Sequence, residues 1–188
     1  AAAAFDQEKA GGFLLTPEEE SIGLQKTLGI AKDRSVALAD LFANKVAPLY
    51  QPNMVEETFR IEIPAAPFDI SGRVDMVDDQ NRVPDLKTSG KKKNQSEADS
   101  SVQLTVYAAG IQILTGKPVP EVRLDVLVDT KEPQFQQIIS TRGRKDFESL
   151  VNRVNTVTKG IKAEVFAPAV TGAWNCHPKW CGFFMTCP

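Results

Sequence analysis

The stretch FDISGRVDMVDDQNRVPDLKT, residues Phe68 to Thr88, decides the fold that the sequence predicts. Two strand-like runs, 68–77 and 82–88, flank four consecutive turn-forming residues. We therefore expect a β-hairpin in which Asp75 lies opposite Pro84 or Asp85. The Cβ atoms of opposed strand residues are about 5 Å apart, so two carboxylates there repel each other unless a positive group lies between them.

A divalent metal ion is the natural positive group for Asp75 and Asp85. Hard cations such as Mg²⁺ and Mn²⁺ prefer oxygen ligands, and the backbone carbonyl of Leu86 would supply a third. Lys87 leaves the same face of the strand as Asp85, with the two Cα atoms about 7 Å apart, so its ammonium can orient or help deprotonate a water. Pro84 cannot donate to a ladder, so we expect an edge or a bulge that re-aims the acids.

Upstream of this hairpin, the sequence predicts a helical segment and then a strand. We expect Thr16 to be the N-cap of a helix that runs to about Leu49, with a break near Gly29. Period-two alternation predicts a strand over 55–63. Its apolar face carries Glu57 together with Val55, Phe59, Ile61 and Ile63.

Downstream of the hairpin, two further strands lie between two helices. We expect a helix over 98–114, strands over 122–128 and 135–140, and a final helix over 144–163. This order predicts an α/β fold, a central mixed sheet flanked by helices, with a C-terminal tail that bears the cysteines.

The composition indicates a single globular domain. The 188 residues are 42% hydrophobic and 24% charged, with a formal net charge of -2, so a polyanion would have to meet a local basic patch. We expect one domain over 1–188, made of a helical part (16–50), a sheet and helix (55–142) and a C-terminal part (144–188).

Three clustered cysteines, without a signal peptide or a long apolar span, predict a cytoplasmic protein with no membrane partner.

A third motif follows the hairpin. Gln103 and Tyr107 are four residues apart and share one face of the predicted helix. Together, GRVD (72–75), DLKT (85–88) and QLTVY (103–107) resemble the GxxD, DxKT and QxxxY motifs of the RecB-like branch of the PD-(D/E)XK nuclease superfamily. The resemblance covers residues 55 to 110 by motif and implies a restriction-endonuclease-like core.

The resemblance implies metal-dependent cleavage of nucleic-acid phosphodiesters. Asp75 and Asp85 would be metal ligands, and Lys87 would act at the attacking water. Gln103 and Tyr107 would support the site or touch the DNA backbone. RecB-like nucleases often carry an early histidine in the metal site, whereas the one histidine here is in the tail. Either that motif lies upstream of residue 1, or Glu57 or another acid takes its place, and Glu57 is the acid we predict.

Two further segments are candidate binding sites. Lys91, Lys92 and Lys93 follow the strand that bears Asp85, where they are either a solvated run or contacts to a passing phosphate backbone. The tail resembles that of AddB-type and CRISPR-adaptation nucleases, in which three C-terminal cysteines and an upstream cysteine hold a [4Fe-4S] cluster. The candidate ligands here are Cys176, Cys181 and Cys187. Zinc with a Cys₃His set that includes His177, or simple packing of the cysteines, are the alternatives.

Two functions are compatible with these observations. The first is a Mg²⁺- or Mn²⁺-dependent exonuclease that acts on DNA ends or single strands in recombination, repair or phage DNA metabolism. The second is a catalytically weak nucleic-acid-binding subunit that works with a helicase or a single-strand annealing protein. Because Asp75, Asp85 and Lys87 are all present, we expect the first.

Overall fold

The computed structural model describes residues 1–8, 15, 17–63, 66, 68–166, 169–170, 172–173, 175–178 and 180–186. Its helices are α1 (Ala2–Glu8), α2 (Pro17–Ile22), α3 (Leu24–Leu41), α4 (Gln95–Asp99), α5 (Val102–Thr115) and α6 (Arg144–Lys162). Its strands are β1 (Pro52–Ile61), β2 (Ile70–Asp78), β3 (Val83–Ser89), β4 (Val122–Val128) and β5 (Gln134–Ser140). A π-helical turn, η2 (Phe42–Val46), and a 3-10 turn, η3 (Ala47–Leu49), connect α3 to β1.

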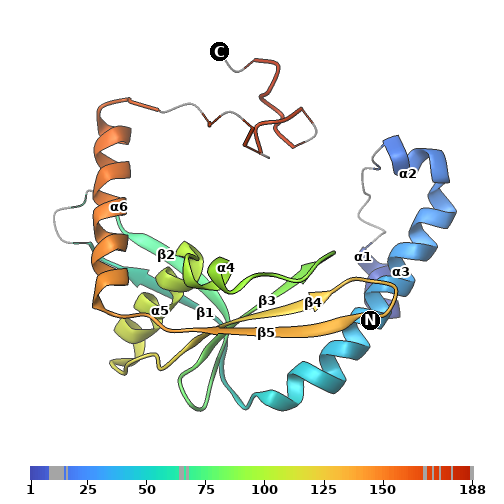
Figure 1. Cartoon of the computed structure of the whole chain (residues 1–188), viewed down its shortest axis with the longest axis horizontal. Helices are drawn as coiled ribbons and strands as arrows, with labels where there is room; N and C mark the ends of the chain where they lie inside the picture. Colours follow the sequence, from blue (N-terminus) through green and yellow to red (C-terminus); the bar gives the residue numbers. More distant parts are fainter. Residues whose placement is uncertain are drawn as a thin grey trace.

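The strands form a mixed sheet between helices, which confirms the α/β fold. Strands β1 and β2 pair antiparallel, β3 and β4 pair parallel, and β4 and β5 pair antiparallel. Figure 1 shows α4 above the sheet, α5 beside β1 and β2, α6 rising at one end, and α2 and α3 at the other. The parallel β3–β4 pair requires a crossover, which α4 and α5 supply. Among the described residues, no helix combines the length and the apolar character needed to cross a membrane.

The predicted hairpin forms its turn but not a continuous ladder. The Asp78 N–H donates to the Arg82 carbonyl at 3.1 Å, yet β2 and β3 belong to two separately hydrogen-bonded pieces of the sheet. Proline at position 84 has no N–H to offer on the edge of β3 that faces β2, which explains the interruption. The expected bulge is also absent from the β3–β4 pairing, which runs without a register shift. We call the unpaired boundary between β2 and β3 the seam.

The N-terminal half of β1 departs from the predicted alternation. Val55 is 63% exposed, although the pattern places it on the apolar face with Phe59 and Ile61. Glu56, between Val55 and Glu57, has a φ of 54°, in the left-handed region that non-glycine residues rarely occupy. The regular alternation predicted from residue 55 therefore holds only in the second half of the strand.

Two helix boundaries also differ from the expectation. The break in the N-terminal helices lies at Gly23, whose φ is 91°, and not at Gly29, which is inside α3. The helix expected from residue 98 begins at Val102, because the Ser101 hydroxyl accepts from the Leu104 N–H and caps a new helix. The predicted N-cap Thr16 lies outside the described residues.

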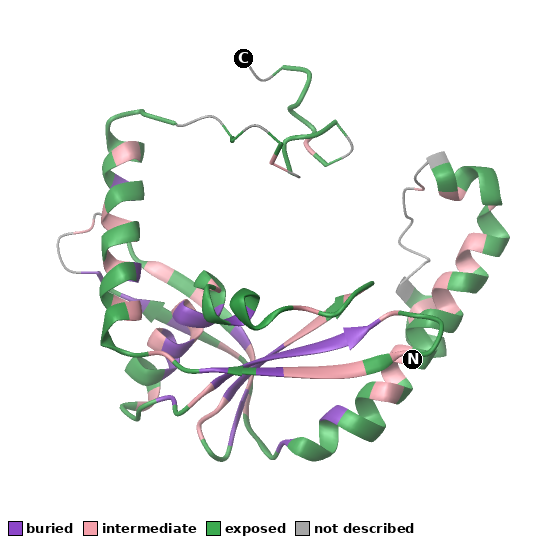
Figure 2. Ribbon diagram, in the orientation of Figure 1, coloured by how far each residue is buried: buried purple, intermediate pink, exposed green. Residues whose placement is uncertain are grey.

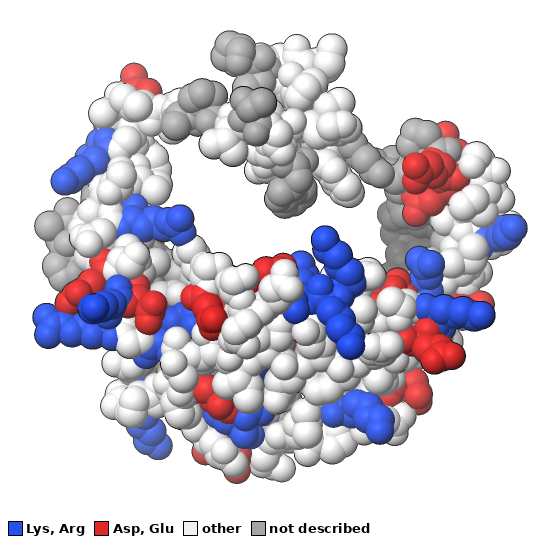
Figure 3. Space-filling view, in the orientation of Figure 1, with Lys and Arg blue, Asp and Glu red and all other residues white. Residues whose placement is uncertain are grey.

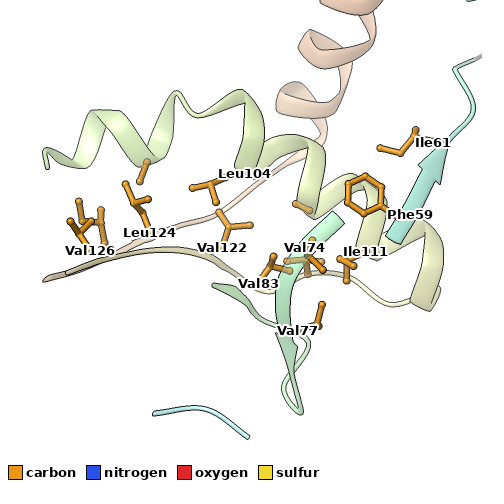
Figure 4. Close-up of a cluster of buried hydrophobic side chains, with 14 of the residues drawn as sticks. Phe59, Ile61, Val74, Val77, Val83, Leu104, Ile111, Val122, Leu124 and Val126 are labelled. Carbon is orange, nitrogen blue, oxygen red and sulfur yellow. The ribbon is translucent and has the colours of Figure 1, made fainter. Parts of the chain in front are cut away.

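The main core lies between α5 and the sheet. Figure 4 shows side chains of β1 to β4 pointing at this helix, and every residue of β4 is buried (Figure 2). Phe59 of β1 needs two glycines: a Cβ at Gly72 of β2 would lie 2.4 Å from the ring, and one at Gly110 of α5 would lie 2.2 Å from it. The glycine of the GRVD motif therefore makes room for the residue that packs α5 on the sheet.

A second cluster lies on the other side of β3 and β4. Its buried members are Val46, Tyr50 and Leu127. Partly buried residues from α3 (Leu38, Leu41), β2 (Met76), β3 (Leu86) and β5 (Phe135) pack against them. We call this group the back cluster, because Leu86 points away from the side that Asp85 and Lys87 occupy.

Candidate active site at the seam

The structure brings Asp75, Asp85 and Lys87 together at the seam. Asp75 Oδ2 accepts the Leu86 N–H at 3.3 Å, which ties β2 to β3 where the ladder is absent. Asp85 is 1% exposed, and its Oδ1 accepts from Lys87 Nζ at 3.0 Å. The Lys87 side chain is 42% exposed, so its ammonium remains within reach of a substrate from solution.

The electrostatics of Asp85 favour a cation beside it. Burial raises the pKa of this carboxyl above its ordinary value, the hydrogen bond and charge of Lys87 oppose the rise, and the nearby Asp75 and Asp125 carboxylates add to it. A positive ion at this place would stabilise the ionised form, which is the form that binds metal.

The available donors fit a hard divalent cation. Within a strand the N–H and C=O of one residue point to the same edge, so the Leu86 carbonyl faces the seam together with the N–H that binds Asp75. Two carboxylates and one carbonyl oxygen are the ligand types that Mg²⁺ and Mn²⁺ prefer. Among the residues that the structure describes, no group of three Asp, Glu, His or Cys side chains could hold a metal ion.

The structure does not bring Glu57 to this group. Strand β1 pairs Glu57 with Val74, the residue before Asp75, and paired side chains share a face. This part of β2 does not alternate regularly, because Val74 and Val77 both belong to the main core while Met76 packs against the back cluster. Among the described residues, however, Glu57 does not form a three-member metal-binding group with Asp75 and Asp85. The predicted role of Glu57 as a metal ligand has no support in this geometry.

Gln103 and Tyr107 of α5 contact each other. Gln103 Nε2 donates to Tyr107 Oη at 2.8 Å, and the Tyr107 ring meets Phe59 edge-on, with ring centroids 6.1 Å apart. The pair is thus fixed between α5 and β1. Its contact with the metal site or with DNA stays a prediction.

The lysine segment after β3 is held to β5. Gln136 of β5 binds Lys93 twice, accepting from its N–H at 2.8 Å and donating to its carbonyl at 2.9 Å. Lys93 Nζ also pairs with Glu97 at 2.9 Å, whereas the side chains of Lys91 and Lys92 are exposed. Figure 3 shows basic side chains beside a hollow, near the end of β3. This hollow lies between the sheet, α3, α6 and the described parts of the tail.

The described part of the tail shows no metal centre. Cys176 is exposed, Cys181 is partly buried, and neither thiol forms a disulfide. Cys187 lies outside the described residues. The predicted iron-sulfur or zinc site therefore has no support from the described residues.

The sequence reasoning missed one buried polar network, which we call the Tyr50 network. Tyr50 Oη donates to Asp125 Oδ2 at 2.5 Å, and Gln137 Nε2 donates to Asp125 Oδ1 and to Tyr50 Oη, each at 2.9 Å. The available signal was a lone acid at the centre of VRLDVLV, an otherwise apolar strand apart from its second residue.

The fold and the seam together define an α/β protein with paired carboxylates beside a lysine. The family model for the PD-(D/E)XK nuclease superfamily matches residues 14–188, so the chain belongs to that superfamily. A search of curated proteins finds no match.

One solved structure shows the same fold, and a second is less similar. A protein from Eubacterium rectale described as a candidate exonuclease superposes with a TM-score of 0.59 at 14% identity, covering 98% of this chain and 70% of that chain. The structure of SSO0001 superposes with a TM-score of 0.48 at 18% identity, covering 82% of this chain and 66% of its own.

Proposed function

We propose that the protein is a metal-dependent nuclease that hydrolyses phosphodiester bonds in DNA. The observation that carries the proposal is the convergence of Asp75, Asp85 and Lys87 at the seam. Two carboxylates beside an exposed ammonium suit a divalent cation and a phosphate at the same place. Membership in the PD-(D/E)XK superfamily supports the same chemistry.

Each residue at the seam has a separate role in the proposed reaction. Asp75, Asp85 and the Leu86 carbonyl would hold Mg²⁺ or Mn²⁺ at a place that the strands fix. Such an ion, when bound, lowers the pKa of a coordinated water and neutralises charge on the phosphate. Lys87 would donate from its ammonium to the attacking water or to a phosphate oxygen, while Asp85 Oδ1 holds that ammonium at 3.0 Å.

The proposed substrate is DNA with free ends or single-stranded DNA. With a net charge of -2, the chain needs a local positive patch for phosphates, and the exposed Lys91 and Lys92 supply one next to the seam. The motif order supports the RecB-like branch, with Gln103 and Tyr107 hydrogen-bonded as a unit. We propose exonuclease action in recombination, repair or phage DNA metabolism.

End-labelled linear DNA and circular DNA, incubated with Mg²⁺ or Mn²⁺, test the proposal. We expect the linear substrate to be degraded, the circular one to stay intact, and the Lys87→Ala variant to leave both intact. Loss of the circular substrate would replace exonuclease with endonuclease action. Binding of DNA without cleavage in either metal would favour the second function, a binding subunit that works with a helicase or annealing protein.

A metal centre on the C-terminal cysteines is a separate proposal. Three thiolates at Cys176, Cys181 and Cys187, with a fourth ligand, would suit a [4Fe-4S] cluster, and with His177 they would suit zinc. Anaerobic purification followed by metal analysis and visible absorption distinguishes the two. A colourless protein with neither iron nor zinc in stoichiometric amount would contradict both.

A further inference from the structure

The seam lacks the backbone ladder that normally fixes the distance between neighbouring strands. Asp75 belongs to the β1–β2 piece of the sheet, whereas Asp85 and Lys87 belong to the β3–β5 piece. Among the described residues near these acids, the hydrogen bond that joins the two pieces runs from the Leu86 N–H to Asp75 Oδ2. The separation of the two carboxylates must therefore be set largely by packing elsewhere.

The back cluster spans the seam immediately behind the acids. Met76, the neighbour of Asp75, and Leu86, between Asp85 and Lys87, both pack against it. Tyr50 is the cluster's one polar buried member, and the Tyr50 network anchors it to the sheet. The cluster thus packs against both strands that carry the acids, on the face opposite Asp85 and Lys87.

Hydrogen bonds and ring contacts hold the side chains of the Tyr50 network in a single arrangement. Each Asp125 oxygen has a donor, from Tyr50 at 2.5 Å and from Gln137 at 2.9 Å. The guanidinium groups of Arg82 and Arg123 lie 5.7 and 5.5 Å from the centre of the Tyr50 ring. Asp125 is also the register partner of Leu86 in the parallel β3–β4 pair. A shift of Tyr50 or Asp125 would thus act on the peptide that contacts Asp75.

We infer that Tyr50, Asp125 and Gln137 are positioning residues, which set the separation of Asp75 and Asp85 from behind the sheet and so tune the affinity of the site for its divalent cation. This role rests on the proposed function, because it presumes that the two acids bind a metal. None of the three residues touches substrate or metal. Their effect passes through Leu86 and Met76.

The test measures metal binding apart from turnover. Mn²⁺ is titrated by calorimetry into the wild type and the Tyr50→Phe variant, which keeps the ring under Arg82 and Arg123 but loses the hydroxyl. We expect Mn²⁺ to bind about tenfold more weakly, the low end of the losses seen when groups that orient metal ligands are changed. On linear DNA we expect kcat to fall about tenfold, with KM for DNA unchanged, because the lysine segment is untouched.

Leu150→Ala is the matched control, because Leu150 is buried in α6 and belongs to neither core cluster. It should lower the melting temperature at least as much as Tyr50→Phe while leaving Mn²⁺ affinity and kcat within about twofold. Gln137→Leu is the second variant, in case Tyr50→Phe fails to fold, and should weaken Mn²⁺ binding in the same direction.

The outcomes separate this inference from the proposed function. Wild-type Mn²⁺ affinity in both network variants would overturn the inference, and so would an equal loss of affinity in Leu150→Ala. A wild type that binds no Mn²⁺ would overturn it too. A wild type that binds Mn²⁺ without cutting DNA would contradict the nuclease alone, and the comparison of affinities would still decide the role of the network.

Discussion

The two faces of the β3–β4 pair differ in what their polar groups do. On the active-site side, Asp85 has one cationic partner, Lys87, which is 42% exposed. On the back, Asp125 is equally buried, but both of its oxygens accept hydrogen bonds from neutral donors held in the same network. Strand β3 therefore carries a carboxylate, Asp85, that can take new partners on the active-site side. The neighbouring strand β4 carries a carboxylate, Asp125, whose two oxygens are already hydrogen-bonded on the back.

This difference separates Asp85, the carboxylate proposed to bind a metal, from Asp125, the carboxylate proposed to position the strands. Burial raises the pKa of both carboxyls, so a shifted pKa alone does not identify the functional one. What distinguishes Asp85 is access, because its partner is a flexible cation that a substrate can reach.

Replacing Asp85, a proposed metal ligand, should have the largest effect. Asp85→Asn is expected to lower DNA cleavage by more than about a hundredfold, the upper range for groups that only support a metal ligand. The melting temperature should stay the same or rise, because a buried charge that desolvation opposes is removed. Cleavage assays and thermal unfolding of the same preparation check both expectations. If the variant cuts DNA at the wild-type rate, Asp85 is not part of the site.

A change in the packing of α5, which covers the active-site side of the sheet, should have the next largest effect. Gly110→Ala should destabilise the protein by about 1 to 3 kcal/mol, because the new methyl group would overlap Phe59, which must shift. Urea unfolding measures the loss. Gly29→Ala in α3 is the control: nothing lies within 4 Å of its position, so it should stabilise by up to about 1 kcal/mol. Equal stability of the two variants would contradict the packing described for α5.

On the back, the expected effect depends on pH. Burial raises the pKa of Asp125, so the folded protein binds this proton more tightly than the unfolded chain. The wild type should therefore gain stability relative to Asp125→Asn as the pH falls from the raised pKa toward the ordinary value of about 3.9, and lose it as the pH rises again.

The expected change is about 1.4 kcal/mol for each unit by which the pKa is raised. Urea unfolding of both proteins between about pH 8 and pH 4 measures it. A difference that stays flat, or that grows as the pH rises, would show that Asp125 is not a buried carboxylate of this kind.

The smallest effect is expected at the lysine segment. Gln136→Leu removes two hydrogen bonds to Lys93 and should weaken binding of labelled single-stranded DNA by about threefold in EDTA, with Mn²⁺ affinity unchanged. Fluorescence anisotropy gives the Kd. Gln134→Leu, at an exposed position of the same strand, is the control and should bind like the wild type. If both variants bind equally well, the segment does not depend on Gln136.

The sequence indicated the strands and the site motifs because their signals are local. Asp75, Asp85 and Lys87 lie within thirteen residues, and a turn of Asp and Asn joins their strands, so simple strand geometry brings them together. The family resemblance then added the role of each residue. The fold class was predicted correctly for the same reason, since the order of helices and strands can be seen in the periodicity.

The features that the sequence did not predict depend on contacts between distant segments or on local backbone geometry. The Tyr50 network joins residues 75 positions apart, and no period reveals such a pair. The seam depends on what the single missing N–H of Pro84 does to a ladder, which a hairpin pattern does not show. The exposure of Val55 follows from the backbone of Glu56, whose positive φ is unusual for its residue type.

The seam also has a consequence for folding. Asp75 is in a two-stranded piece built from neighbouring segments of the chain, and Asp85 is in a piece that needs the α4–α5 crossover before β4 can pair. A chain in which only one piece has formed contains half of the proposed metal site. The proposed activity thus begins only when the two pieces dock, and hydrogen exchange at the Leu86 amide would report that docking step directly.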